Sequence, residues 1–309
     1  VNYVKIAIPF FLLLILFESY RAQRQRKKWY RLNDTINSLT CGIYNQIAGV
    51  LFASTIFIIT YGSIQSKFAL FQFNHLSIEA KLGHALFLFT AVDLGYYWFH
   101  RCAHRVNLIW GAHIVHHQSE AYNLSTALRQ SMFQNCFSWV FYAPLAIIGY
   151  PLSWFLAMLS LNNVYQFWIH TQSINKLPRF FELIFNTPSH HRVHHGRNTE
   201  YLDKNYAGTL IIWDKLFDTF AEEQKEVSYG ITTGLNSWNP LWAQFHYFWH
   251  LLHTSLYSPF WSDKIKIWYK APDWKSKQQR LQTKEDSFHT FTIYNPPMSQ
   301  KAMWSASLC

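Results

Sequence analysis

The sequence predicts an all-α protein, a polytopic bundle of membrane helices with a histidine-rich site for two metal ions on its cytosolic side. Half of the 309 residues are hydrophobic and only 14% are charged, a low charged fraction for a soluble domain. Two long stretches, residues 39–66 and 130–175, contain no Asp, Glu, Lys or Arg. Nine of the sixteen histidines fall in three short clusters, HRCAH, HIVHH and SHHRVHH.

Five apolar segments are predicted to cross the membrane. A helix rises about 1.5 Å per residue, so about 20 apolar residues cross a hydrocarbon layer of about 30 Å. The first charge-free stretch supplies one span and the second supplies two, with Tyr150-Pro151 as the turn between them. A soluble helical core is the alternative that these stretches disfavour. The predicted spans lie near residues 3–20, 41–64, 82–99, 132–150 and 152–170.

Basic residues orient the predicted bundle. Six of them follow the first apolar segment: Arg21, Arg24, Arg26, Lys27, Lys28 and Arg31. Cytosolic loops carry such an excess, so this loop is expected in the cytosol and residue 1 on the lumenal side. Nucleic-acid binding is the rival interpretation of the run and of the net charge of +10. Because the run lies beside a predicted span, we interpret it as a signal for membrane orientation and as a contact with anionic lipid. We expect no nucleic-acid partner. Alternation of the spans then places every histidine cluster on the cytosolic side.

We expect residues 1–275 to form one integral-membrane domain, with its cytosolic metal-site regions at 100–130 and 176–240. Residues 276–309, rich in Lys, Gln and Ser, are expected to be a loose tail. The aromatic segment 241–269 either spans the membrane or lies at its surface, and we interpret its histidines (His246, His250 and His253) as packing or interfacial residues. Because the first residue is Val, we expect the natural chain to begin further upstream.

The spacing of the histidines predicts a metal site. His100 and His104 are four residues apart, as are His113 and His117, while His191 and His194 are three apart. Residues at these spacings share one face of a helix, so each cluster directs several imidazoles toward one point. Eight imidazoles exceed the needs of one ion and suit two ions with open positions for O₂, and no CxxC motif competes for them. Imidazole suits iron, zinc, copper and nickel alike, so the ligand chemistry leaves the metal open.

The three clusters and the segments around them resemble the fatty acid hydroxylase and sterol desaturase superfamily. The resemblance is carried by HxxxH, HxxHH and HxxHH, within residues 93–131, 165–178 and 186–220. It is closest to the members that act on glycerol ether lipids, and extends more weakly over most of the first 275 residues.

The resemblance implies an enzyme of the endoplasmic reticulum membrane that uses two iron ions, O₂ and tetrahydrobiopterin. Such an enzyme hydroxylates the carbon next to the ether oxygen of an alkylglycerol lipid. The resulting hemiacetal breaks down to a fatty aldehyde and glycerol, or the corresponding lysolipid headgroup. No residue pattern shows a pterin pocket, and no HPGG motif indicates a fused cytochrome b5 domain. The electrons are therefore expected from a separate pterin donor.

The resemblance also implies roles for individual residues. The residues matching the family's metal ligands are His100, His104, His113, His116, His117, His191, His194 and His195, with His170 resembling an additional ligand. Asp93 lies two helical turns before His100 and could orient an imidazole through its free N–H. Glu120 and Asn123 could do the same, with helix capping or a solvated loop as the alternative. His190 points about 100° away from His191 on a helix and is expected behind the ligands. Asp203 and Asp214 have surface or similar supporting roles.

Two other functions stay open from the sequence. A sterol or fatty-acyl hydroxylase or desaturase of the same superfamily would keep the histidine clusters but take electrons from cytochrome b5. A non-enzymatic membrane protein that binds or transports zinc is the more remote alternative. Transporters place ionisable residues near the middle of the membrane, whereas these clusters follow the ends of the predicted spans.

Overall fold

The computed structural model describes residues 3–73, 77–276 and 293–296. Within these ranges the regular elements are all helical, and extended pairing is limited to two isolated bridges, Phe185 with Leu210 and Gly196 with Tyr229. The all-α prediction is confirmed. Most of the expected tail lies outside the described residues.

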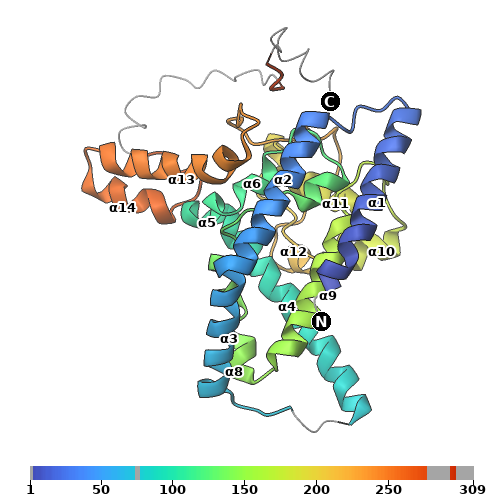
Figure 1. Ribbon diagram of the computed structural model, residues 1–309, viewed down its shortest axis with the longest axis vertical. Helices are drawn as coiled ribbons and strands as arrows, with labels where there is room; N and C mark the ends of the chain where they lie inside the picture. Colours follow the sequence, from blue (N-terminus) through green and yellow to red (C-terminus); the bar gives the residue numbers. More distant parts are fainter. Residues whose placement is uncertain (1–2, 74–76, 277–292, 297–309) are drawn as a thin grey trace.

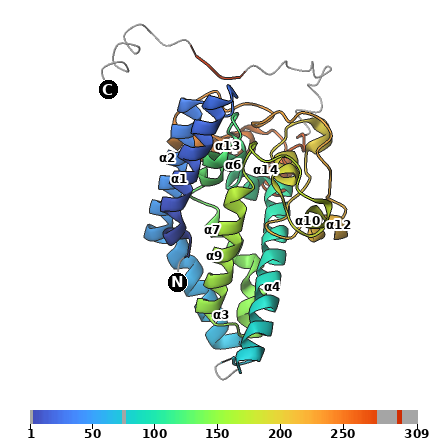
Figure 2. The ribbon, with the colours of Figure 1, turned by 90° about the vertical axis from the view of Figure 1, so that its right-hand side faces the viewer.

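Five long helices run along the long axis of the molecule (Figures 1 and 2). These are α1 (Tyr3–Arg24), α2 (Leu32–Ala48), α3 (Ser54–Phe68), α4 (Ile78–Arg105) and α9 (Leu152–Trp168). The π-helical segment η1 (Gly49–Ala53) joins α2 to α3. α9 packs against both α4 and α1, and aromatic side chains such as Tyr61, Tyr142 and Phe155 fill the core beside α3 and α4. α4 contains the predicted span 82–99 and continues without a break into the first histidine cluster.

Length and composition identify few of these helices as membrane spans. In the described part of the chain, Ile6–Arg24 passes such a test alone, and Leu32–Leu51 with Thr55–Phe68 passes only as a pair bent by 46°. The surface adds support: α1 exposes Phe10, Leu13 and Leu16, each by 62–67%. Exposed apolar surface of this kind marks contact with lipid or with another protein.

The predicted span at 132–150 is not one continuous helix. The segment is divided into α7 (Asn135–Ser138), the 3-10 turn η3 (Trp139–Phe141) and α8 (Ala143–Ile148). α8 ends at Gly149, whose φ of 109° is left-handed and where a Cβ would lie 2.0 Å from the Phe71 carbonyl oxygen. A charge-free composition reports apolar surroundings but not helix continuity. This close packing against the segment after α3 ends α8. Pro144, at the start of α8, lacks the N–H that would continue a helix from the preceding residues.

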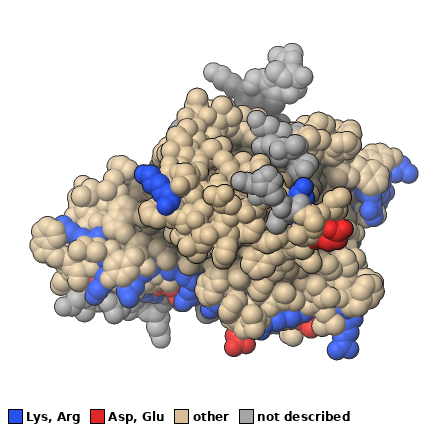
Figure 3. Space-filling model, turned by 90° about the horizontal axis from the view of Figure 1, so that it is seen from below, with Lys and Arg blue, Asp and Glu red and all other residues tan. Residues whose placement is uncertain are grey.

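Short helices gather at one end of the long helices and carry the second and third histidine clusters (Figure 1). They are α5 (Asn107–Gly111), α6 (Ile114–His117), η2 (Leu124–Leu128), α10 (Arg179–Ile184), α11 (Pro188–His194), η4 (Thr199–Tyr201) and α12 (Ile212–Leu216). Figure 3 views the molecule from the opposite end. This face is mostly uncharged, with Lys and Arg toward its rim, as expected for a bundle whose charged cap lies outside the lipid.

The aromatic segment 241–269 forms a helical hairpin of α13 (Pro240–Tyr257) and α14 (Trp261–Tyr269). The hairpin lies across the direction of the long helices, beside the short-helix end (Figure 1). This orientation favours the interfacial alternative over a further span.

Candidate metal centre

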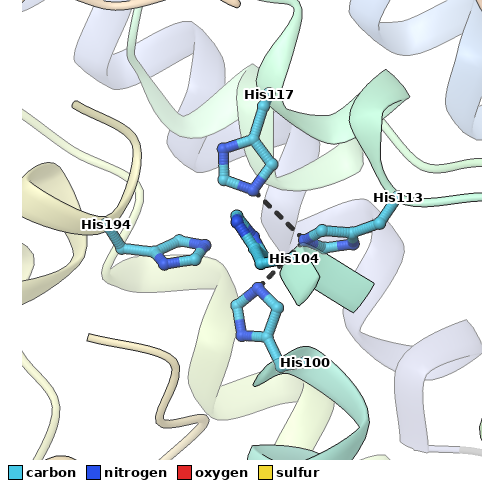
Figure 4. Close-up of side chains that lie close together, drawn as sticks. All are labelled: His100, His104, His113, His117 and His194. Atoms are coloured by element: carbon cyan, nitrogen blue, oxygen red, sulfur yellow. Dashed lines mark hydrogen bonds between the residues drawn. The ribbon is translucent and has the colours of Figure 1, made fainter. Parts of the chain in front are cut away.

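Five imidazoles from three helices converge on one point. His100 and His104 come from α4, His113 and His117 from the start and end of α6, and His194 from α11 (Figure 4). One nitrogen of each ring lies within 4.8 Å of one nitrogen of every other ring, and all five residues are buried. We call this set group 1.

Four further imidazoles form a second set, which we call group 2. His116 comes from α6, His170 from the turn after α9, and His191 and His195 from α11 and its C-terminal cap. Their nitrogens also lie within 4.8 Å of one another. The two groups adjoin, because the rings of His117 and His195 stack with their centres 4.4 Å apart. The structure thus brings all nine predicted histidines together, divided between two places where a metal ion could bind.

Hydrogen bonds on the outer side of group 1 direct lone pairs inward. The His100 Nδ1 donates to the Tyr206 carbonyl oxygen at 2.7 Å, and the His113 Nδ1 donates to Gln134 Oε1 at 3.3 Å. Each neutral ring then carries an unprotonated Nε2. These two Nε2 atoms lie only 2.9 Å apart (Figure 4). Two lone pairs at this distance repel each other unless a cation lies beside both.

Group 2 repeats the arrangement. The His116 Nδ1 donates to the Arg129 carbonyl oxygen at 3.0 Å and the His170 Nδ1 donates to the Gln166 carbonyl oxygen at 2.7 Å. Their Nε2 atoms lie 3.1 Å apart. With metal–nitrogen bonds of about 2.1 Å, two ligands at a right angle are about 3.0 Å apart, so the observed spacings suit a shared ion.

Unpartnered nitrogens provide the same test of fit. Among the described residues, buried ring nitrogens of four of these histidines make no hydrogen bond: Nε2 of His104, His194 and His195, and Nδ1 of His191. Buried polar atoms are almost always paired. A cation in each group would give the three Nε2 atoms a partner, so the residues fit a pair of metal ions. The His191 ring directs its Nε2 into group 2, 2.9 Å from that of His170.

Burial keeps the imidazoles neutral. It lowers the pKa of His116 to about 4 and that of His194 to about 3, and lowers the pKa values of His113 and His117 well below the ordinary 6.5. The neighbouring histidines, and Arg129 beside His116, also lower these pKa values. Metals bind the neutral ring, so the site favours the protonation state that a metal requires.

Asp93 has other partners than the imidazole expected for it. Its carboxylate accepts hydrogen bonds from the backbone N–H groups of Thr209 and Leu210, at 2.7 and 3.0 Å, and from the side chains of Asn162 and Trp213. Asp93 therefore ties α4 to α9 and to the segment before α12. The helical spacing predicted that Asp93 would lie on the face of His100. Donors from residues 209–213 bind its carboxylate instead.

Glu120 and Asn123 also contact groups outside the two histidine groups. Glu120 binds Arg31 at 2.9 Å and accepts from the Tyr294 N–H at 3.1 Å. Asn123 caps η2 by accepting from the Ser125 N–H at 3.0 Å. Capping was the alternative for Asn123, and the structure favours it. Asn123 starts the turn η2 and Glu120 lies three residues before it. Backbone N–H groups reach both side chains there, and no hydrogen bond to an imidazole is formed among the described residues.

The groups that orient the imidazoles are mostly backbone carbonyl oxygens. The sequence could not predict them, because every residue type has one. The Tyr206, Arg129, Gln166 and Lys204 carbonyl oxygens each accept from a histidine Nδ1. Asp214 supports one of them by accepting from the Tyr206 and Ala207 N–H groups, both at 2.8 Å. His190 lies outside both groups, with its ring 5.3 Å from that of Phe220.

Arg129 was also missed. Its buried guanidinium donates to the Val115 carbonyl oxygen at 2.7 Å and to Gln118 Oε1 at 2.8 Å, on both sides of His116 and His117. Its own carbonyl oxygen accepts from His116. In the sequence, Arg129 is the last charged residue before the charge-free stretch 130–175. This position was the only feature that could have pointed to it.

Comparisons with known proteins agree with this site. Residues 85–219, which hold all nine histidines, match the fatty acid hydroxylase family. The chain is 44% identical over 286 residues to an alkylglycerol monooxygenase of Homo sapiens, 41% over 285 residues to one of Xenopus tropicalis and 42% over 286 residues to one of Danio rerio. No solved structure is significantly similar to the chain.

These alignments cover 91–92% of the present chain but only 61–63% of the relatives. The chain thus spans somewhat less than two thirds of their length, and the matched part includes both histidine groups.

Proposed function

Because residues 85–219 match the fatty acid hydroxylase family, we propose that the chain belongs to this family and is an alkylglycerol monooxygenase. It hydroxylates the carbon next to the ether oxygen of an alkylglycerol lipid, using O₂ and a tetrahydrobiopterin donor. The observation that carries this proposal is the convergence of nine buried histidines into two adjoining groups, at the end of helices with exposed apolar surface.

The nine histidines would hold two iron ions, five in group 1 and four in group 2. When bound, the two ions and O₂ would supply the oxidant, and the pterin would supply two electrons and two protons. One oxygen atom enters the C–H bond and the other leaves as water. The bond between the hemiacetal carbon and the glycerol oxygen then breaks, and the proton of the new hydroxyl group moves to that oxygen, giving a fatty aldehyde and a free glycerol hydroxyl.

The protein's own contribution is to fix and shield the ligands. Backbone carbonyls hold Nδ1–H of His100, His116, His170 and His194, which sets each ring's orientation and leaves Nε2 free to bind. Burial of all nine rings keeps water away from the reacting carbon.

We place the site at the cytosolic surface of the endoplasmic reticulum membrane, with residues 1–275 acting as one integral-membrane unit. The support is twofold: α1 and the α2–α3 pair have the apolar composition of spans, and basic residues follow α1 directly. The alkyl chain would approach from the lipid and the soluble pterin from the cytosol.

The test is an aldehyde assay. Membranes containing the chain are incubated with a labelled alkylglycerol, with and without tetrahydrobiopterin, and fatty aldehyde is measured. The expected result is aldehyde that requires the pterin and is abolished by His113→Ala, with the variant still present in the membrane. Aldehyde formation that depends on cytochrome b5 instead would contradict the proposal, and purified protein that holds zinc without iron after anaerobic, reducing preparation would favour a non-enzymatic role.

A further inference from the structure

A cavity of about 470 Å³ lies between α10, α11 and α12, apart from the two histidine groups. Ser189 and His190 of α11 line it, whereas the next residue, His191, points into group 2. Three cations, Lys176, Arg179 and Lys215, also line the cavity, and Phe220 forms an aromatic wall. The proposed oxidation makes no use of any of these side chains.

Two of the three acidic side chains at the cavity, Glu182 and Glu223, are engaged in hydrogen bonds. Glu223 forms two hydrogen bonds with Arg192, at 2.8 and 2.6 Å. Glu182 accepts from the Leu177 N–H at 2.9 Å and from Ser189 Oγ at 2.8 Å. Glu222 forms only a long contact with Lys176, 3.7 Å between two exposed side chains.

The cations are less committed than the acids. In the described ranges neither Arg179 nor Lys215 forms an ion pair with a carboxylate, and Lys215 instead donates to the Glu182 and Leu183 carbonyl oxygens. Arg179 and Lys215 are therefore the cations available to an added anion, while Glu182 keeps its negative charge in the same lining. A guanidinium and an ammonium at one opening are the groups that proteins use to bind phosphate.

His190, one of the residues that line the cavity, has a buried ring nitrogen without a partner in the described part of the chain. His190 is only 3% exposed, and its Nδ1 makes no hydrogen bond among the described residues. Buried polar atoms are almost always paired, so a polar ligand that reached the inner wall of the cavity would be stabilised by this nitrogen. A phosphate monoester suits this nitrogen in either tautomer, because it offers both P–O⁻ acceptors and a P–OH donor.

Exposed apolar side chains lie on the same helices as Arg179 and Lys215. Phe180 and Leu183 of α10 are 71% and 51% exposed, and Leu216 of α12 is 67% exposed. Basic residues beside exposed apolar ones are typical of a surface that rests on anionic lipid. This favours a lipid over a free anion as the source of the phosphate.

We propose that the cavity between α10, α11 and α12 binds the phosphate monoester headgroup of a membrane lipid, such as a phosphatidate. Arg179 and Lys215 pair with the phosphate oxygens, His190 forms a hydrogen bond to it, and the exposed side chains of α10 and α12 contact the acyl chains. The site is independent of the proposed oxidation.

The test measures lipid binding directly. The full chain, purified with its metal, is titrated calorimetrically with short-chain phosphatidate, with the corresponding phosphatidylcholine, with inorganic phosphate and with tetrahydrobiopterin. Phosphatidate is expected to bind at least tenfold more tightly than phosphatidylcholine or inorganic phosphate. The double variant Arg179→Gln/Lys215→Gln is expected to lose at least tenfold in phosphatidate affinity while keeping its metal content.

Two variants keep the result interpretable. Arg179→Gln alone removes an exposed side chain, so it should fold normally and lose several-fold in affinity. Lys225→Gln makes the same charge change outside the cavity, at an exposed side chain paired with Glu200, and should bind like the parent. Unchanged phosphatidate affinity in the double variant overturns the proposal. Inorganic phosphate that binds as tightly as phosphatidate overturns the lipid source, and pterin binding lost in the double variant with phosphatidate binding intact assigns the cavity to the pterin instead.

Discussion

The Nε2 atoms of His116 and His170 lie 3.1 Å apart, although 54 residues separate the two histidines in the chain. Each ring donates its Nδ1–H to a backbone carbonyl oxygen, so both Nε2 atoms present lone pairs. His116 belongs to a cluster that the sequence makes obvious, whereas His170 stands alone at the end of α9. Their contact makes the lone histidine part of group 2.

Replacement of His170 by Ala should therefore affect metal binding as strongly as replacement of His116. Each variant is expected to reduce the metal content from about two ions per chain toward one, because group 1 keeps its five rings. Metal analysis of purified protein measures this. His253→Ala, which changes an exposed histidine of α13, is the control and should keep both ions. A His170→Ala protein with full metal content would exclude this residue as a ligand.

Removal of the metal should lower the thermal stability of the protein. The paired Nε2 atoms of His100 and His113, 2.9 Å apart, repel each other when no cation lies between them. A ligand that binds only the folded state also stabilises it by mass action. Thermal unfolding in detergent, before and after anaerobic chelation, gives the comparison. The melting temperature should fall by several degrees and recover when Fe(II) is added back; equal melting temperatures with the metal verifiably absent would count against these sites.

Arg129→Gln should weaken both the fold and the metal site. The guanidinium binds the Val115 carbonyl oxygen and Gln118, so its loss leaves buried groups unpaired at a cost of about 2–4 kcal/mol. It also loosens α6, and changes to groups that orient ligands typically cost about 10–100-fold in metal affinity. Chemical unfolding and competitive metal titration measure the two effects. Arg129→Lys keeps the charge and should recover part of the stability; a Gln variant with parental metal affinity would show that Arg129 does not position α6.

Asp214 should give the protein a stability difference that depends on pH. Burial raises the pKa of its carboxyl group to about 6, although hydrogen bonds from Thr219 and the backbone oppose this. The folded state then binds a proton that the unfolded state has released, so this group's contribution is complete below about pH 4 and is lost as the pH rises through about 6, a change of about 3 kcal/mol. Because the histidines titrate in the opposite sense, the measurement is the difference in unfolding free energy between the parent and Asp214→Asn. This difference should shift in favour of Asn as the pH rises from 4 to 7, and a difference that is constant with pH would contradict the raised pKa.

Much of the site could be read from local patterns. Spacings of three and four residues on helices predict which imidazoles share a face, and α4 shows the expected arrangement of His100 and His104 because helical geometry is fixed by the backbone. The all-helical character followed in the same way from apolar stretches of sufficient length. The division of residues 132–150 into three short helices did not, because a charge-free composition does not report helix continuity, and the end of α8 depends on the contact of Gly149 with Phe71.

The roles of Asp93, Glu120 and Asn123 show where pattern reasoning ends. Each is a polar residue in a plausible position, but its partners are backbone donors and side chains brought in from distant segments, such as Thr209 and Leu210 for Asp93. The groups that do orient the rings are carbonyl oxygens, which every residue possesses. No residue type could have indicated them.

Residue identity and spacing were enough to specify a helical chain with many neutral nitrogen ligands, because these properties depend on neighbours within about one helical turn. The assignment of each ring to one group or the other, the contact of His170 with His116 and the cavity behind α11 came only from the folded chain. They depend on how α4, α6, α9 and α11 pack against one another, and packing distances between segments far apart in sequence are not encoded in any single segment.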